Sequence, residues 1–451
     1  MFRAAVPRLT LIVLAVCLVL FPGTACAAPW STFGFDPERT GFDPLETAIT
    51  PANVGALHQL WSTDVGGAVD TQASYAGGLV LVGTEQGDEI ALDAATGSIV
   101  WRRSLGKQHT TCHDTPGGDY GVSAPAVIDG TRAYVAGGDG KLHALDVATG
   151  AEAPGFPVTI TAKPKIEHVW GALNLFDGRV YAGVASFCDN AFYRGAIVAI
   201  DVARAKRVAR LYLTKPHVFG GGVWGWGGVG IDTTNGRVYA ATANAQTHKQ
   251  NADYAEHVLR LSPSLKVESA DDAPVRRRGD ADFGAAPILF RRTGCPPQLA
   301  VMHKSGMLLL YDRSRVGRGP RQRLQLGDRG SEDAFGTYAW ADGRLFVALP
   351  SGQSPYRGGV VALRLGSDCR LKRGWQGTTG DDHDLRASPI VAGGIVWSSA
   401  GQRLYALDET DGHRLWTSGS AFGQVVTAAP ALGDGRVFTS SWDGRVRAFG
   451  L

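Results

Sequence analysis

The residues best suited to chemistry lie in one glycine-rich stretch, Val223–Asn244, which reads VWGWGGVGIDTTNGRVYAATAN. It holds Trp224 and Trp226 among glycines, and it ends at a carboxamide, Asn244. Glycines beside an indole let a flat molecule lie against the ring without a competing side chain. The amide places a hard oxygen at the end of the following strand. The stretch therefore predicts a site for a flat ligand that carries a cation on its edge.

The same stretch also admits a purely structural interpretation. Glycine-rich turns and buried tryptophans are common in repeats of four-stranded sheets, where tryptophans join neighbouring sheets. One short motif does not decide between these two interpretations.

The composition is that of a globular protein with many turns. The chain has 451 residues, of which 44% are apolar and 60 are glycine. Forty-five basic and 42 acidic residues give a formal net charge of +3, and the one dense basic run is Arg276-Arg277-Arg278. This near balance argues against nucleic acid as a partner.

Residues 1–27 are predicted to be an export signal. Two arginines precede the apolar run Leu9–Phe21, and Ala25-Cys26-Ala27 offers a small-residue cleavage site. The run is too short for a permanent transmembrane helix, and no other segment is long and apolar enough. Acylation of Cys26 is the alternative, but Gly23 stands where an aliphatic residue is expected. We therefore expect an exported protein, periplasmic or secreted, with residues 28–49 as an N-terminal extension.

Four cysteines follow the leader: Cys112, Cys188, Cys295 and Cys369. In an exported chain they are expected to pair, although four cysteines allow three connectivities. We expect Cys112 with Cys188 and Cys295 with Cys369. The sequence has no C-x-x-C pair that would indicate zinc, and no C-x-x-C-H that would attach haem.

Behind these residues the chain is a set of repeats. The clearest copy spans Gly78–Gly106 and contains the turn A-x-D-x-x-T-G-x-x-x-W at Ala91–Trp101. The turn recurs at Ala406–Trp416 with Asp411 in place of the threonine, and at Ala144–Gly150 without the tryptophan. The aspartate of such a turn caps amides and the glycine takes a positive φ. We expect four tryptophans to join adjacent sheets: Trp61, Trp101, Trp375 and Trp416.

A strand of the type RVYAG, followed by one of the type GAIVAID, occurs eight times and marks eight copies of the repeat. These strands lie near Leu79, Ala133, Val180, Val238, Leu299, Leu345, Ile395 and Val437. The last copy lacks its outer strand, whereas His58–Gly67 resembles an outer strand with nothing before it. Two half-sheets that complete each other indicate a closed ring rather than a solenoid. The predicted fold is an all-β, eight-bladed β-propeller of four-stranded antiparallel blades over residues 50–451, closed by pairing of the N-terminal strand with the C-terminal blade.

Polar insertions between strands are expected to lie on the faces of the propeller, where one face forms a funnel around the axis. They are Lys107–Tyr120, Ser186–Tyr193, Gln246–Glu256 and Asp381–Asp384. The last of these is interpreted as a solvated loop, with a cation site as the alternative.

With these turns and eight copies, the chain resembles the quinoprotein alcohol dehydrogenases, including polyvinyl-alcohol-dehydrogenase-like proteins. It is also similar to the non-catalytic assembly scaffold of the outer-membrane protein machinery. The first resemblance implies bound pyrroloquinoline quinone (PQQ) and calcium on the propeller axis.

The resemblance carries over to particular residues. The family segment W-G-…-D-…-Y-x-x-x-x-N matches here without a gap, which implies that Trp226 supports the quinone and Asn244 binds calcium. The segment around Asp282 resembles the one that supplies the catalytic aspartate, with Asp280 as the reserve. Lys304, before Ser305-Gly306, resembles the cation that contacts the quinone oxygens. Taken singly, a turn aspartate, a strand-end asparagine and a hairpin lysine are the structural alternatives.

Two positions depart from the family pattern. Asn190 stands where the family has a calcium-binding glutamate, so that Asp189 would have to turn inward to restore the charge. Cys112-His113-Asp114 replaces a pair of adjacent cysteines that covers the quinone, and His113 is the candidate to stack there instead.

Two functions therefore remain open. The first is a PQQ- and calcium-dependent dehydrogenase of small alcohols, polyols or a polymer, with Asp282 as the base and an external electron acceptor. The second is a non-catalytic propeller that binds a protein or an envelope polymer. The fold does not choose between them.

Overall fold

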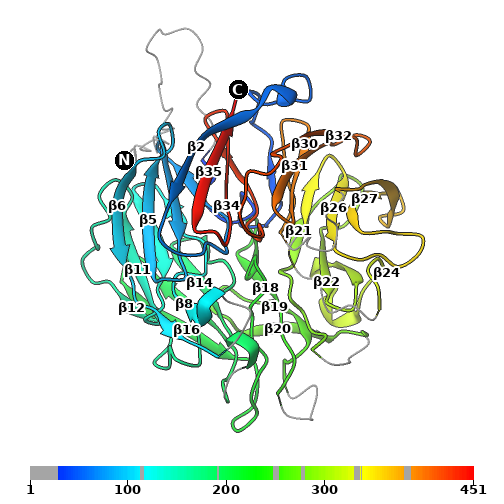
Figure 1. The fold of residues 1–451 in the computed structure, drawn as a ribbon. Helices are drawn as coiled ribbons and strands as arrows, with labels where there is room; N and C mark the ends of the chain where they lie inside the picture. Colours follow the sequence, from blue (N-terminus) through cyan, green and yellow to red (C-terminus); the bar gives the residue numbers. More distant parts are fainter. Residues whose placement is uncertain are drawn as a thin grey trace, which may run out of the picture.

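The chain forms eight β-sheets arranged as the blades of a propeller (Figure 1). The computed structural model describes residues 29–111, 116–189, 192–246, 253–275, 280–329, 336, 338–379 and 387–451. Each blade has four antiparallel strands, and the seventh carries in addition β1 (Phe42–Asp43), which pairs in parallel with β29. The predicted fold class is confirmed.

Blades are numbered here by the order of their first strands. Blade 1 consists of β3 (Ser74–Ala76), β4 (Leu79–Gly83), β5 (Asp88–Asp93) and β6 (Ile99–Ser104), and blade 2 of β9 (Val127–Asp129), β10 (Arg132–Ala136), β11 (Lys141–Asp146) and β12 (Val158–Thr159). Blade 3 consists of β13 (Asn174–Phe176), β14 (Arg179–Val184), β15 (Ala196–Asp201) and β16 (Lys206–Tyr212), and blade 4 of β17 (Gly230–Asp232), β18 (Arg237–Ala241), β19 (His257–Leu261) and β20 (Val267–Asp272).

Blade 5 consists of β21 (Ile288–Phe290), β22 (Gln298–His303), β23 (Met307–Asp312) and β24 (Gln322–Gln325), and blade 6 of β25 (Ala339–Ala341), β26 (Arg344–Leu349), β27 (Gly359–Leu365) and β28 (Leu371–Gly377). Blade 7 consists of β29 (Ile390–Ala392), β30 (Ile395–Ala400), β31 (Arg403–Asp408) and β32 (Arg414–Thr417), and blade 8 of β33 (Ala431–Gly433), β34 (Arg436–Ser440), β35 (Arg445–Gly450) and β2 (His58–Asp64). All eight strands expected from the repeats are second strands of blades.

The short first strands line the axis, because those of neighbouring blades contact one another. Second and third strands are buried on both faces, as in β4 and β5, whereas the outer strand β6 buries only Trp101. Since the strands alternate in direction, two kinds of connection share one end of the propeller. These are the hairpins between second and third strands and the links from each fourth strand to the next blade.

The eighth blade is built from distant parts of the chain. β2 pairs with β35 from His58↔Gly450 to Asp64↔Arg445, and Figure 1 shows the two strands side by side. Arg445 reinforces the pairing through Ser62, whose hydroxyl accepts a hydrogen bond from Nε at 2.8 Å.

The four repeat tryptophans join adjacent blades, as predicted. Each indole Nε1 donates to a carbonyl of the next blade: Trp61 to Ala94 (3.0 Å), Trp101 to Val147 (2.8 Å), Trp375 to Glu409 (2.8 Å) and Trp416 to Leu57 (3.1 Å). The ring lies over the turn glycine, and a methyl group on Gly97 would come within 2.6 Å of Trp61. That glycine has a φ of 73°. The turn sequence therefore serves both the hairpin and the contact between blades.

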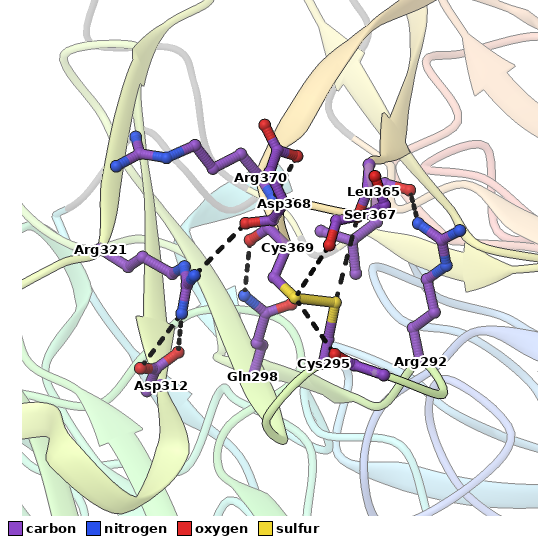
Figure 2. The surroundings of a disulfide bond; sticks show 12 residues. Arg292, Cys295, Gln298, Asp312, Arg321, Leu365, Ser367, Asp368, Cys369 and Arg370 are labelled. Atoms are coloured by element: carbon purple, nitrogen blue, oxygen red, sulfur yellow. Dashed lines mark hydrogen bonds and ion pairs between the residues drawn. A yellow bond between two sulfur atoms is a disulfide. The ribbon is translucent and has the colours of Figure 1, made fainter.

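A disulfide links blades 5 and 6 (Figure 2). It joins Cys295, between β21 and β22, to Cys369, between β27 and β28, as expected. Gln298 Nε2 donates to the carbonyl of Cys369 at 3.0 Å, and Arg321 donates to the carbonyl of Asp368 at 3.3 Å. Within the described part of the chain, no helix is long and apolar enough to cross a membrane.

The contact between Trp61 and Gly97 can be tested with a matched glycine. Gly97→Ala places a methyl group against the indole, whereas Gly78 has a similar φ (79°) and nothing within 4 Å of the added carbon. Both variants adopt an unfavourable backbone conformation, so we expect Gly78→Ala to lose about 1 kcal/mol of unfolding free energy and Gly97→Ala about 1–3 kcal/mol more. Urea unfolding measures both, and equal losses would contradict the packing described here.

Glu89 in β5 generates a pH-dependent prediction. Its side chain is fully buried, neither oxygen accepts a hydrogen bond from a described residue, and burial raises its pKa to about 8. The folded state therefore holds the proton more tightly than the unfolded state, and stability is lost as pH rises from about 4.5 to about 8. Relative to Glu89→Gln, we expect the wild type to lose on the order of 4 kcal/mol between pH 5 and pH 8.5, measured as unfolding free energy. Parallel pH profiles would show that Glu89 is paired.

Candidate functional site

The candidate residues that the structure describes lie at the end of the propeller that carries the two kinds of connection. Trp224 and Trp226 belong to the link from β16 to β17, and Asp282 to the link from β20 to β21. Lys304 forms the hairpin between β22 and β23, and Asp189 ends the short helix η3 (Phe187–Asp189) between β14 and β15. Blades 3 to 5 therefore supply the site.

Glycines let the links of neighbouring blades touch through their backbones. A methyl group on Gly225 would come within 2.7 Å of the Gly284 backbone, and one on Gly171 within 2.7 Å of the Gly225 carbonyl oxygen. Gly228, at a φ of 62°, leaves no room beside the carbonyl of Ala172. The glycine-rich sequence around the tryptophans thus serves close approach of backbones.

Trp226 lies across the axis. It belongs to the link into blade 4, yet it packs in one buried cluster with Ala429 from the link into blade 8, on the opposite side of the ring. Phe33 and Ala172 complete the cluster, and Trp170 meets Trp226 edge-on at a centroid distance of 5.3 Å. The side chain is 6% exposed, and its Nε1 has no acceptor among the described residues. The indole therefore closes the centre of the propeller.

Trp224 is joined to the two charged candidates. Its Nε1 donates to Asp282 Oδ2 at 3.1 Å, and Lys304 Nζ lies 4.7 Å from the centre of the ring. Lys304 Nζ is 3.2 Å from Asp282 Oδ1 and 2.7 Å from Asp280 Oδ2. The structure thus brings Asp282 and Lys304 together, with the reserve candidate Asp280 at the exposed side of the pair.

Burial governs the charges of this pair. Burial raises the pKa of Asp282 above its ordinary value, and the positive charge of Lys304 offsets this effect only in part. Burial acts to lower the pKa of Lys304, but the two aspartates outweigh it and the pKa is raised. Asp282 Oδ1 lies within ion-pair distance of Nζ but accepts no well-aligned hydrogen bond from the residues that the structure describes. A buried carboxylate with a raised pKa is suited to accept a proton.

Asp189 lies within electrostatic reach of this pair. Burial raises its pKa to about 6, a hydrogen bond with Tyr193 lowers it, and the charge of Asp282 raises it further. Gln246 Nε2 donates to the Asp189 carbonyl at 2.5 Å, and the carbonyl of Asn244 accepts the Gly221 amide at 2.7 Å. The segments that carry Asp189 and Asn244 are therefore bound to one another beside the tryptophan link.

Several predicted positions lie outside the described residues: Cys112, His113, Asn190 and Asp381–Asp384. Cys188 is disulfide-bonded, and its expected partner Cys112 is one of these positions. Among the side chains that the structure describes, no group of three or more His, Cys, Asp or Glu residues could hold a metal ion. A cation here would need amide or carbonyl oxygens in addition to carboxylates.

Sequence reasoning assigned no role to Trp170, although it stacks on Trp224 at 5.3 Å with an interplanar angle of 22°. Trp170 belongs to the link into blade 3, and its ring also contacts the ring of Phe187, with the two centroids 4.9 Å apart. A signal was present in the sequence, because the dipeptide Trp-Gly occurs at 170–171 as well as at 224–225 and 226–227. Its recurrence marks links that approach the axis.

Comparisons with known proteins agree with this architecture. A family model described as "Glucose/ethanol/alcohol dehydrogenase, beta-propeller domain" matches residues 30–163, and one described as "Outer membrane protein assembly factor BamB" matches residues 337–450. The chain is 25% identical to polyvinylalcohol dehydrogenase of Sphingopyxis sp. (strain 113P3), over 94% of this chain and 65% of the relative. It is 25% identical to polyvinylalcohol dehydrogenase of Pseudomonas sp., over 90% of this chain and 70% of that protein.

Among solved structures, the quinohemoprotein alcohol dehydrogenase from Comamonas testosteroni shares the fold with a TM-score of 0.72 and 17% sequence identity. The similarity covers 93% of this chain and 80% of that one. The chain thus spans about two thirds of the length of the polyvinylalcohol dehydrogenases that it matches.

A double-mutant cycle tests the buried ion pair. Lys304→Met leaves the Asp282 carboxylate buried without its cation, so we expect a loss of about 3–5 kcal/mol of unfolding free energy at pH 7. Asp282→Asn should rescue part of that loss in the double variant, with a coupling of at least about 1 kcal/mol. Additive losses in urea unfolding would mean that Lys304 and Asp282 do not interact.

Proposed function

Because the chain belongs to the PQQ-repeat eight-bladed propeller proteins, we propose that it is a PQQ- and calcium-dependent dehydrogenase of alcohols or polyols. The observation that carries the proposal is the meeting of Trp224, Asp282 and Lys304 beside an axial indole, Trp226. When bound, PQQ supplies a carbonyl that accepts hydride, and calcium polarises that carbonyl.

The described residues fit such a ligand in two respects. Asp282 Oδ1 is buried without an aligned donor, and Trp226 Nε1 is buried without an acceptor. Trp226 holds the plane of the ligand, and Asp282 takes the hydroxyl proton of the alcohol on a carboxylate whose pKa burial raises. Lys304 stabilises negative charge that develops on a ligand oxygen.

Calcium fits through oxygens from several segments. Asp282 and Asp189 repel each other electrostatically, and a divalent cation between them would relieve that repulsion. Asn244 and Asn190 supply amide oxygens in this proposal, with Asn190 in the place of a carboxylate. His113, which lies outside the described residues, would be the side chain that stacks on the ligand in this proposal.

The substrate and the compartment are part of the proposal. The name polyvinylalcohol dehydrogenase of two relatives supports an alcohol, a polyol or a polymer as the substrate of this chain. The electron acceptor in this proposal is external. The Cys295–Cys369 disulfide supports an exported protein, periplasmic or secreted, because disulfides persist in oxidising compartments.

The second candidate function is a non-catalytic scaffold that binds a protein or an envelope polymer. The observation that favours it is the match of residues 337–450 to the description of an outer-membrane assembly factor. Asn190 and Cys112-His113, which depart from the dehydrogenase pattern, point the same way.

Reconstitution separates the two functions. The purified protein is supplied with PQQ and Ca²⁺, desalted, and assayed for quinone absorbance and for dye reduction with alcohols. We expect Asp282→Asn to retain the quinone but to reduce dye at least about 100-fold more slowly. The neighbouring variant Asp280→Asn removes a similar charge from Lys304 and should lose less than about tenfold.

Absence of retained quinone in the wild type would leave the scaffold function. Equal activity in Asp282→Asn and the wild type would remove Asp282 as the base.

A further inference from the structure

An N-terminal segment, residues 30–43, runs around the axis inside the ring, and we call it the collar. Its carbonyls accept the amide of the middle residue of the first strand in six blades. The donors are Tyr75 (2.9 Å), Ile128 (2.7 Å), Ile231 (2.8 Å), Leu289 (2.9 Å), Trp340 (2.7 Å) and Val391 (2.7 Å). The acceptors follow in chain order from Trp30 to Gly41. The collar thus visits the blades in the order in which they occur in the sequence.

The collar places Arg39 and Phe33 directly beside the tryptophan link. Phe33 packs in the buried cluster of Trp226, and the Arg39 guanidinium carbon lies 6.0 Å from the centre of the Phe33 ring. The collar accepts a hydrogen bond from the amide of Ile231 in the middle of β17, whereas Trp226 lies before the start of that strand. Phe33 and Arg39 therefore lie on the axial side of Trp226 that faces away from the loop-bearing end.

The Arg39 guanidinium donates hydrogen bonds to backbone carbonyls of two links, the tryptophan link into blade 4 and the link into blade 3. Nε donates to the carbonyls of Gly227 at 2.9 Å and Val229 at 3.2 Å, immediately after Trp226. Nη2 donates to the carbonyl of Leu173 at 2.7 Å, in the link into blade 3. Nη1 completes the set within the collar, to Phe33 O at 2.8 Å and Thr32 Oγ1 at 2.9 Å. One planar side chain thus fixes two links and the collar to each other.

Burying the Arg39 guanidinium costs more free energy than a residue with only a packing role would require. Arg39 is fully buried, and its five hydrogen bonds to described residues go to carbonyl or hydroxyl oxygens rather than to a carboxylate. Burial lowers its pKa to about 9, so the side chain is still charged at neutral pH. A buried cation is destabilising unless its donors are fully used, which makes its geometry strict.

We propose that Arg39 is a positioning residue that fixes the plane of Trp226, so that the collar forms the underside of the quinone site. This inference rests on the proposed function. It assigns part of the binding site to the N-terminal extension, which carries none of the matched site motifs.

The test compares three variants of the full chain. Arg39→Met keeps the length of the side chain without its donors, and Arg39→Lys keeps the charge but not the planar fork. Arg313→Met is the matched control, because Arg313 is also buried but pairs with Asp232 at 3.2 Å, at the end of β17 that is farther along the chain from Trp226. Urea unfolding measures the loss of stability of each variant.

Two measurements report on the tryptophan link and on PQQ binding directly. Amide hydrogen exchange of residues 225–229 in the ligand-free protein reports the order of the tryptophan link. Quenching of tryptophan fluorescence by PQQ in the presence of Ca²⁺ reports affinity without turnover. We expect Arg39→Met to raise both the exchange rate and the PQQ dissociation constant at least tenfold. Arg39→Lys should lie between Arg39→Met and the wild type, and Arg313→Met should change neither readout.

The outcomes are distinct. Unchanged exchange in Arg39→Met, or equal changes in Arg313→Met, would overturn the positioning role. Faster exchange with an unchanged PQQ dissociation constant would overturn its connection to the site. If the wild type itself does not quench with PQQ, the proposed function fails, and the exchange data still decide whether Arg39 orders the link.

Discussion

The inner edge of each blade presents unpaired backbone amides to a narrow axis. An unsatisfied amide that is shielded from water is costly, and a free strand edge also invites pairing with another chain. In this protein the collar accepts those amides in six of the blades. The centre of the ring is therefore filled by main chain and by Phe33 and Arg39, and Trp226 packs against that filling. The shape of the candidate site depends on how the axis is closed.

The charged part of the site follows from the same geometry. Links that converge on the axis bring Asp282 and Trp224 from neighbouring blades within hydrogen-bond distance, and the hairpin at Lys304 lies over both. Burial makes the carboxylate more basic, while the lysine stays protonated. The buried pair of Asp282 and Lys304 lies against Trp224, next to the axial indole of Trp226. This feature is what sets the dehydrogenase proposal above the alternative.

Local sequence predicted the blades well, because their determinants are local. The alternation of apolar residues and the turn Asp93-x-x-Thr96-Gly97 specify hairpins, and Trp101 follows at a fixed spacing. Asp282 and Lys304 were found through resemblance to a family, and the structure brings them together. Arg39 could not be found in this way. Its sequence neighbourhood, Asp36-Pro-Glu-Arg-Thr-Gly41, is typical of an exposed turn, and its acceptors in the links lie 134 to 190 residues away.

The composite eighth blade has a consequence for the order of assembly. Ser62 and Arg445, which bond across it, are 383 residues apart, so β2 has no partner until the last strands of the chain have been made. Contacts of such sequence separation form late and slowly. Seven blades can therefore take shape while the ring is still a horseshoe, and its two ends expose apolar surface during that time. A chaperone that shields these ends, or transport of the chain before it folds, would protect it until the ring shuts.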